Sequence, residues 1–207
     1  MKILLVSLVT LVSLANAELV APKEGCILSQ QGAVLVNWKA YKTPAKLGVG
    51  GIFDKVAYTP AQKEGKNFKE ILVGSSVDIN TTSVNSNNKG RDAKLVNSFF
   101  KLMSDEKIVA KIVDMTSNKR VAKEPRTGTI TIEVTMNGVT KKVPLNYSYS
   151  KGIMKSQGVI DILDFSGSQA LVSINKACFD KHQGKTWSDV QIGFDMNIKA
   201  LVCATKD

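Results

Sequence analysis

The chain has 207 residues, of which 43% are hydrophobic, and it carries a formal net charge of +10. This length favours a single domain with one sizeable core and excludes a large multidomain architecture. The positive charge favours an anionic partner such as a phospholipid surface. Lysines that alternate with apolar residues are, however, also typical of the solvated face of strands.

The first 17 residues have the three parts of a secretory signal peptide. Met1-Lys2 is positive, Ile3 to Leu14 is apolar, and Ala15-Asn16-Ala17 is a small-x-small cleavage site. The apolar run is shorter than the roughly 20 residues that a membrane-spanning helix needs, although an uncleaved anchor is the alternative. We therefore expect a mature domain over residues 18–207 that is periplasmic or secreted. Export would also separate it from nucleic acid.

Apolar and mostly polar residues alternate in five segments: 34–39, 71–80, 129–136, 142–149 and 191–199. This period of two is typical of half-buried antiparallel strands. Asn137-Gly138 predicts a tight hairpin, because a type I′ turn needs positive φ at both central residues. Lys151-Gly152 is a second turn candidate, and Gly48 to Gly51 suggests an irregular connection. The pattern predicts an all-β sandwich or barrel.

Two segments depart from this alternation. In residues 88–100, Leu95, Phe99 and Phe100 share one helical face, and Asp92 suits the first turn of a helix. A second short helix or a long loop is expected over residues 175–187. We therefore predict one or two short helices packed on the sheet.

The chain has three cysteines, Cys26, Cys178 and Cys203, and two of them would tend to pair in an oxidising compartment. Closure of a barrel would make the first and last strands neighbours, which favours a disulfide between Cys26 and Cys203. A Cys178–Cys203 bond is the alternative, and spacing alone does not decide between them.

Few residues are available for catalysis. The only histidine is His182, and Cys178 lies four residues before it, so a redox or stress-related enzyme using this pair is one hypothesis. Two ligands fall short of a zinc site. The chain lacks a glycine-rich phosphate loop and a nucleophile elbow, and no basic-aromatic cluster resembles a nucleic-acid platform. We expect a protein without catalytic residues, metal or nucleic-acid partner.

The residues expected to point into a barrel are aliphatic or aromatic, and none is charged. Ser75 and Ala110 are small and could leave space among them. Alternation alone fits a solid core and a dry cavity equally well, since a small barrel can be filled by side chains or hold one ligand. The candidate interior residues are Val34, Val36, Trp38, Phe53, Ile71, Val73, Val77, Phe99, Ile130, Ile132, Leu145, Tyr147, Ile192, Phe194 and Ile198.

Several motifs resemble the YceI-like family of secreted, lipocalin-like bacterial proteins associated with polyisoprenoid binding. The first is the stretch from Val77 to Val84, followed by Arg91-Asp92-x-x-Leu95 and Phe99-Phe100. The second is the hairpin over residues 128–143, where Lys142 replaces the family's usual Pro and two extra residues lengthen the hairpin. A third is the glycine-rich segment ending at Phe53. The similarity covers residues 31–198, and residues 175–187 resemble an ε-proteobacterial subset.

This resemblance implies an elongated, eight-stranded antiparallel barrel with a helix across it. It implies a bound long-chain amphiphile, such as a polyisoprenoid, an isoprenoid quinone, or a fatty acid or amide, and it moves the interpretation from a solid core toward a cavity. It also implies a homodimer. No catalytic residues carry over, and Arg91 and Asp92 are interpreted as structural. The leading hypothesis is a lipid-binding protein without another cofactor.

Overall fold

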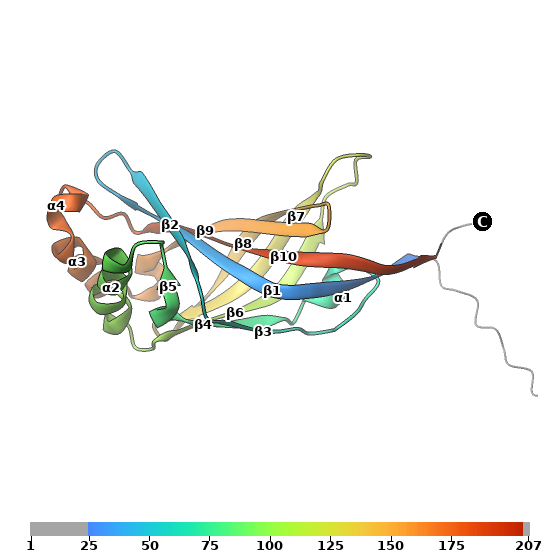
Figure 1. Ribbon diagram of the computed structural model, residues 1–207, viewed down its shortest axis with the longest axis horizontal. Coiled ribbons are helices and arrows are strands. Elements are labelled where there is room, and N and C mark those ends of the chain that lie inside the picture. Colours follow the sequence, from blue (N-terminus) through green and yellow to red (C-terminus); the bar gives the residue numbers. More distant parts are fainter. Residues whose placement is uncertain (1–24, 205–207) are drawn as a thin grey trace, which may run out of the picture.

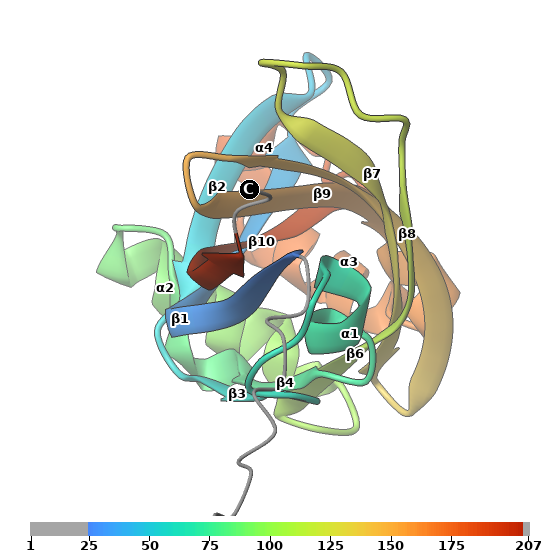
Figure 2. The same cartoon turned by 90° about the vertical axis from the view of Figure 1, so that its right-hand side faces the viewer.

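Ten antiparallel strands form one curled sheet in the computed structural model, which describes residues 25–204 (Figures 1 and 2). The hydrogen-bonded order is β3-β4-β6-β7-β8-β9-β10-β1-β2-β5. The strands are β1 (Gly25–Lys42), β2 (Leu47–Phe53), β3 (Val56–Thr59), β4 (Ser76–Asn80), β5 (Val84–Asn85), β6 (Lys107–Ser117), β7 (Arg126–Met136), β8 (Val139–Ser150), β9 (Ile153–Asp161) and β10 (Asp189–Ala204). The all-β, antiparallel prediction is confirmed. The signal-peptide prediction lies outside the described residues.

The predicted count of eight strands was wrong because two long chain segments are each broken into two strands. A 3₁₀ turn, η1 (Thr81–Ser83), separates β4 from β5, and Asp54-Lys55 separates β2 from β3. Asn80 creates the turn, since its side chain accepts hydrogen bonds from the Thr82 amide at 2.9 Å and the Thr82 hydroxyl at 2.7 Å. Such side-chain bonds compete with the strand ladder.

Both predicted hairpin turns are confirmed. Asn137 and Gly138 have φ values of 52° and 72°, and Lys151 and Gly152 have 51° and 81°. The prediction of an irregular connection at Gly48 to Gly51 was wrong, because these residues lie within β2. Gly51 is needed there for close approach: a Cβ atom would lie 2.4 Å from the Asn85 carbonyl oxygen of β5.

Four short α-helices accompany the sheet in the described part of the chain, which is more than the one or two expected. The helix predicted over residues 88–100 is confirmed as α2 (Lys89–Ser98), capped by the Asn88 side chain. The second expected helical region begins earlier than residue 175 and contains α3 (Ser168–Ala177) and α4 (Phe179–His182).

The first helix, α1 (Phe68–Leu72), corrects the prediction that residues 71–80 form one strand. Asn67 caps this helix through a 2.9 Å bond from the Glu70 amide, and Glu70 accepts a 2.7 Å bond from the Lys66 amide. This arrangement is a variant of the capping box, in which Glu70 bonds the amide one residue before the N-cap, and it favours a helix over continuation of the strand. Phe68, Ile71 and Leu72 are buried, so α1 anchors firmly against the sheet.

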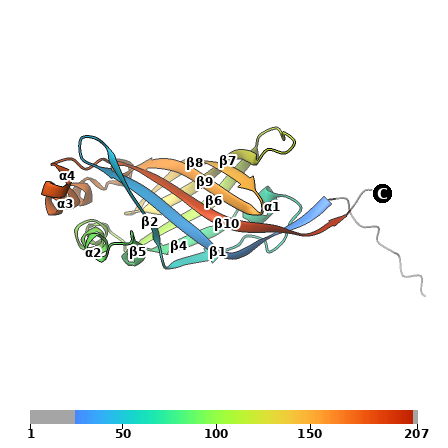
Figure 3. The same cartoon turned by 45° about the horizontal axis from the view of Figure 1, so that its top comes forward.

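The helices divide the molecule into two ends. Figure 3 shows α1 at the end from which β1 and β10 extend, and α2, α3 and α4 at the opposite end. Figure 2 shows α1 lying inside the curl of the sheet. We call the end that contains α1 the plugged end, and the end that contains α2, α3 and α4 the helical end. The β1–β10 ribbon beyond the plugged end sets Cys26 opposite Cys203 in the strand register.

Candidate functional site

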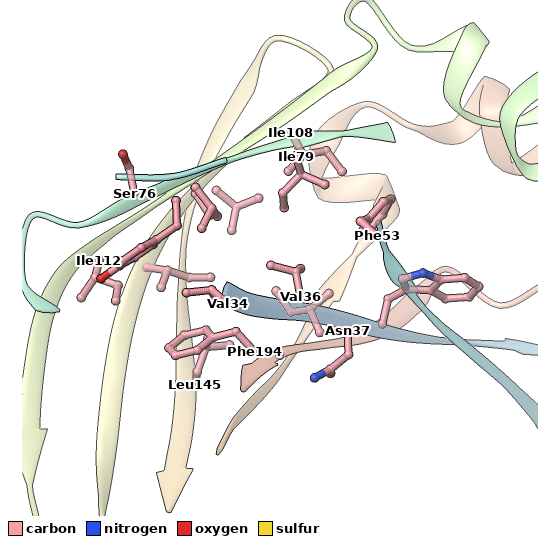
Figure 4. Close-up of a pocket in the computed structure, with 18 of the residues that line it drawn as sticks. Val34, Val36, Asn37, Phe53, Ser76, Ile79, Ile108, Ile112, Leu145 and Phe194 are labelled. Atoms are coloured by element: carbon pink, nitrogen blue, oxygen red, sulfur yellow. The ribbon is translucent and has the colours of Figure 1, made fainter. Parts of the chain in front are cut away.

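A cavity of about 100 Å³, the barrel cavity, lies inside the curled sheet. Val34 and Val36 of β1, Ile79 of β4 and Ile108 of β6 point toward it, and Phe53 of β2 lies at one side (Figure 4). The residues that line it include no Asp, Glu, Lys, Arg or His. Its walls therefore favour an apolar occupant.

Two polar side chains of the barrel cavity, Tyr58 and Ser75, are already paired. The Tyr58 hydroxyl donates to Ser75 Oγ at 3.2 Å, and Ser75 Oγ bonds the Ile71 carbonyl at 3.2 Å and the Ala61 amide at 2.9 Å. Burial raises the pKa of Tyr58 above its ordinary value, and the bond to Ser75 offsets this only in part. Tyr58 is thus neutral at physiological pH, and the barrel cavity presents no ionised group.

A second cavity of about 170 Å³, the helical-end cavity, lies between the sheet and helices α2 to α4. Its walls are mainly apolar, with Leu95 and Phe99 from the α2 region and Leu171 and Ile174 from α3. Unlike the barrel cavity, it also has cationic residues in its lining: Lys42, Arg91 and Lys94. No Asp or Glu lines it.

The two cavities adjoin, because six residues line both of them. These shared residues are Trp38, Phe53, Ile108, Met136, Ile160 and Ile192. These side chains lie between the two spaces, and Met136 among them is unbranched and adaptable. The structure therefore has two adjoining apolar chambers, with charge at the helical end alone, and movement of the shared side chains would join them into one channel.

The structure brings ten of the fifteen candidate interior residues to these cavities. The remaining five pack around the plugged end: Ile71 lies in α1, Val73 is its C-cap residue, and Tyr147 contacts Phe68 of α1. Ile71, Ile130 and Ile198 have no exposed surface. The ten that line a cavity are Val34, Val36, Trp38, Phe53, Val77, Phe99, Ile132, Leu145, Ile192 and Phe194.

Part of the lining was not expected from the sequence, although Ala110 was named there as a small residue among the interior ones. Ile108 and Ile112 of β6 alternate with Val109 and Lys111 around Ala110, so a period-two signal was present there. Leu171 and Ile174 of α3 carried only a short helical spacing. Lys42 and Lys94 carried no distinguishing signal, since they belong to different elements and meet only in the fold.

Arg91 and Asp92 fasten α2 to the end of β5. Arg91 Nε donates to Ser86 Oγ at 2.7 Å, and its NH2 group donates to the Ser86 carbonyl at 2.8 Å. Asp92 accepts hydrogen bonds from the Ser86 amide at 2.9 Å and from the Ser86 hydroxyl. These contacts agree with the structural interpretation of both residues.

Cys178 and His182 both line the helical-end cavity, and Cys178 is a free, half-buried thiol. His182 Nδ1 bonds Thr186 Oγ1 at 2.7 Å, and Thr186 Oγ1 donates to Asn175 Oδ1 at 2.8 Å. Because that hydroxyl has one proton, Nδ1 must be the donor to it. The pKa of His182 lies below its ordinary value, mainly through burial and also through the nearby charges of Lys42 and Lys94.

Within residues 25–204, no cluster of three or more His, Cys, Asp or Glu side chains could hold a metal ion. No helix within that range is long and apolar enough to cross a membrane.

Solved structures with the same fold include three bacterial proteins. A polyisoprenoid binding domain from Saccharophagus degradans has a TM-score of 0.57 and 14% identity, covering 84% of this chain and 98% of its own. BcnA from Burkholderia cenocepacia has a TM-score of 0.52 and 14% identity, and the match covers 81% of this chain and 96% of BcnA. The YCEI protein of Campylobacter jejuni has a TM-score of 0.50 and 20% identity, and the match covers 77% of this chain and 86% of the Campylobacter protein.

No curated protein matches the chain at a significant level. The family model for the YceI-like domain, by contrast, matches residues 33–199, which is most of the chain. This match spans both cavities and every strand from within β1 to within β10. The chain belongs to the YceI-like family.

Proposed function

We propose that this protein binds one long-chain amphiphile, with the hydrocarbon chain in the barrel cavity and the helical-end cavity, and that it is a carrier rather than an enzyme. The observation that carries the proposal is the uncharged, apolar lining of the barrel cavity and its junction with the helical-end cavity. The Saccharophagus degradans protein of the same fold is described as a polyisoprenoid binding domain, which supports an isoprenoid or similar chain as the ligand.

The energetics favour a chain over a compact ligand. An apolar cavity of about 150 Å³ holds benzene, so the helical-end cavity alone suits only a small group. A longer chain must occupy both cavities, with Trp38 and Met136 turning aside between them. Each buried methylene contributes about 0.8 kcal/mol. Ten of them would contribute on the order of 8 kcal/mol before the costs of ordering.

Candidate ligands are a polyisoprenoid, an isoprenoid quinone, and a fatty acid or its amide. The proposed location is the periplasm or the exterior, after cleavage near Ala17. A homodimer and an association with anionic membranes remain proposals that accompany this one. The alternative of an enzyme using Cys178 and His182 is less favoured, because no hydrogen bond joins the Cys178 thiol to the His182 ring among the described residues, where the ring bonds Thr186 through Nδ1.

Ala110→Phe tests the proposal by filling the barrel cavity. Ala110 lines that cavity from β6 and faces Val77 of β4 and Val134 of β7 in the strand register. We expect wild-type protein to bind a geranylgeranyl-chain probe and to quench its tryptophan fluorescence, since Trp38 and Trp187, the only two tryptophans, line the cavities. Ala110→Phe should weaken binding at least about tenfold, equivalent to about 1.4 kcal/mol.

Val159→Phe is the matched control, because Val159 is 59% exposed on β9 and lies outside both cavities. It should bind like wild type. Native mass spectrometry of gently purified wild type should show a bound lipid. An empty protein that also fails to bind any chain would refute the proposal.

A further inference from the structure

The cationic residues of the helical-end cavity lack the carboxylate partners that five lysines elsewhere on the surface have. Lys46, Lys69, Lys107, Lys142 and Lys155 each lie within 4.0 Å of a carboxylate. No such pair involves Lys42, Arg91 or Lys94 in the part of the chain that the structure describes, and no carboxylate lines their cavity. Asp92 shares the Ser86 hydroxyl with Arg91 and offsets its charge, so the charges without a carboxylate partner at this cavity are those of Lys42 and Lys94.

These charges come from two separate elements, β1 and α2. Lys42 ends β1 and is bridged to Thr186, while Lys94 projects from α2 and donates to the Ala177 carbonyl of α3 at 3.0 Å. Both lysines and His182 line this one cavity, and the charges of the two lysines also lower the pKa of His182. Like charges gathered at one site repel each other, and a bound anion relieves that repulsion.

The opposite end of the channel is closed by packed aromatic and aliphatic side chains. The aromatic rings of Phe68 and Tyr149 have centroids 4.7 Å apart, and those of Phe68 and Tyr147 are 6.3 Å apart. The buried residues Ile71 and Leu72 of α1 complete this plug. A ligand with one charged end and one apolar chain would therefore bind with its charge at the helical end, because the reverse orientation would bury an ion among apolar side chains.

We propose that the helical-end cavity binds the anionic headgroup of the amphiphile, a phosphate or a carboxylate, between Lys42 and Lys94, with the chain running toward α1. This inference rests on the proposed function and narrows its ligand class. It favours a polyprenyl phosphate or a fatty acid over a neutral quinone, alcohol or amide. Hydrogen bonds to charged groups are the stronger ones, so the preference should be large.

The test compares ligands that share one chain and differ only at the headgroup: hexadecyl phosphate, palmitate, palmitamide and hexadecanol. Binding is followed by the fluorescence of Trp38 and Trp187. We expect wild type to bind the two anions at least about tenfold more tightly than the two neutral compounds. Lys42→Gln/Lys94→Gln should lose this preference and keep its affinity for hexadecanol.

The control variant is Lys39→Gln/Lys89→Gln, which removes the same net charge from the same strand and helix. Lys39 and Lys89 are exposed and line neither cavity, so the preference should persist. Arg91 is left intact because it fastens α2 to Ser86. An unchanged circular dichroism spectrum and denaturation midpoint in each variant establish that the fold is retained.

The outcomes separate the two proposals. If wild type binds all four compounds equally, or if both double variants keep the preference, the headgroup assignment is wrong and the proposed function stands. If no compound binds, the proposed function itself fails. Inorganic phosphate alone should leave the fluorescence unchanged at concentrations that saturate hexadecyl phosphate. Equally tight binding of free phosphate would overturn the assignment to a lipid headgroup.

Discussion

The plugged end and the helical end are built from similar apolar residues but pack them differently. At the plugged end α1 enters the curl of the sheet, and Ile71, Ile130 and Ile198 have no exposed surface. At the helical end α2 and α3 stay outside the sheet and leave about 170 Å³ of space. Alternation therefore sets which side chains face inward, and the placement of helices decides whether the interior is filled.

The largest expected effect comes from making the same substitution at both ends. Ile71→Ala removes atoms from a fully buried site and should lower the free energy of unfolding by about 2–5 kcal/mol. Ile192→Ala alters a side chain that already borders open space between the cavities, so its loss should be less than half as large. Urea denaturation of both variants measures the difference. Equal losses would contradict the contrast between the ends.

A second effect concerns the ribbon that extends from the plugged end. Cys26 and Cys203 are opposite one another in the register, and directly paired residues have Cα atoms about 4.5–5.5 Å apart, which suits a disulfide. We predict this bond in the oxidised protein, and reduction should cost about 2–4 kcal/mol of stability.

Thiol titration checks the disulfide. Non-reduced, unfolded protein should yield one free thiol, from Cys178, and peptide mapping should link Cys26 to Cys203. Three reactive thiols, or a link through Cys178, would show that the prediction is wrong. The Cys178→Ser variant is the control and should leave the midpoint of denaturation almost unchanged.

A smaller effect should appear when α2 is loosened at the helical end. Ser86→Ala removes the hydroxyl that Arg91 and Asp92 share, which should cost about 1–3 kcal/mol because both charged groups lose a partner. Faster amide exchange in α2, with unchanged exchange in α1, would confirm that the two ends respond separately. Ser98→Ala on the same helix serves as the control.

The smallest effect is a pH dependence of folding stability that arises from His182 at the helical end. Because the pKa of His182 is lowered in the folded protein, the unfolded chain binds a proton between that lowered value and the ordinary value near 6.5. Stability should therefore fall as the pH decreases through this window and level off below it. Denaturation midpoints at several pH values measure this, and His182→Gln should remove it. If the pH dependence of stability persists in that variant, it arises from a group other than His182.

Much of the sheet was predictable because alternation and turn chemistry are local. Val34, Val36 and Trp38 face inward as expected, and Asn137-Gly138 forms its hairpin. The start of segment 71–80 was wrongly predicted as strand, because Ile71 and Val73 continue the alternation of β4. The signal for a helix lay just before it, where Asn67 and Glu70 have the spacing of a capping box. That box was visible in the sequence and could have predicted α1.

The remainder of the site depends on contacts between distant segments. Lys42 and Lys94 are 52 positions apart, and each alone is an ordinary solvated lysine in the sequence. Their convergence follows from the packing of α2 on β5 and α3, which no local pattern specifies. The absence of a filling side chain is likewise a property of the assembled walls, so the volume of a cavity could not be inferred from the alternation.

The α1 helix also makes the channel a molecular ruler. A chain that enters from the helical end advances until its terminal methyl meets Phe68 and Ile71, and it can go no further. Affinity should thus climb with each added carbon and then reach a plateau, because later carbons stay in contact with water. The position of that plateau would report the depth of the channel, and residue 71 would set it.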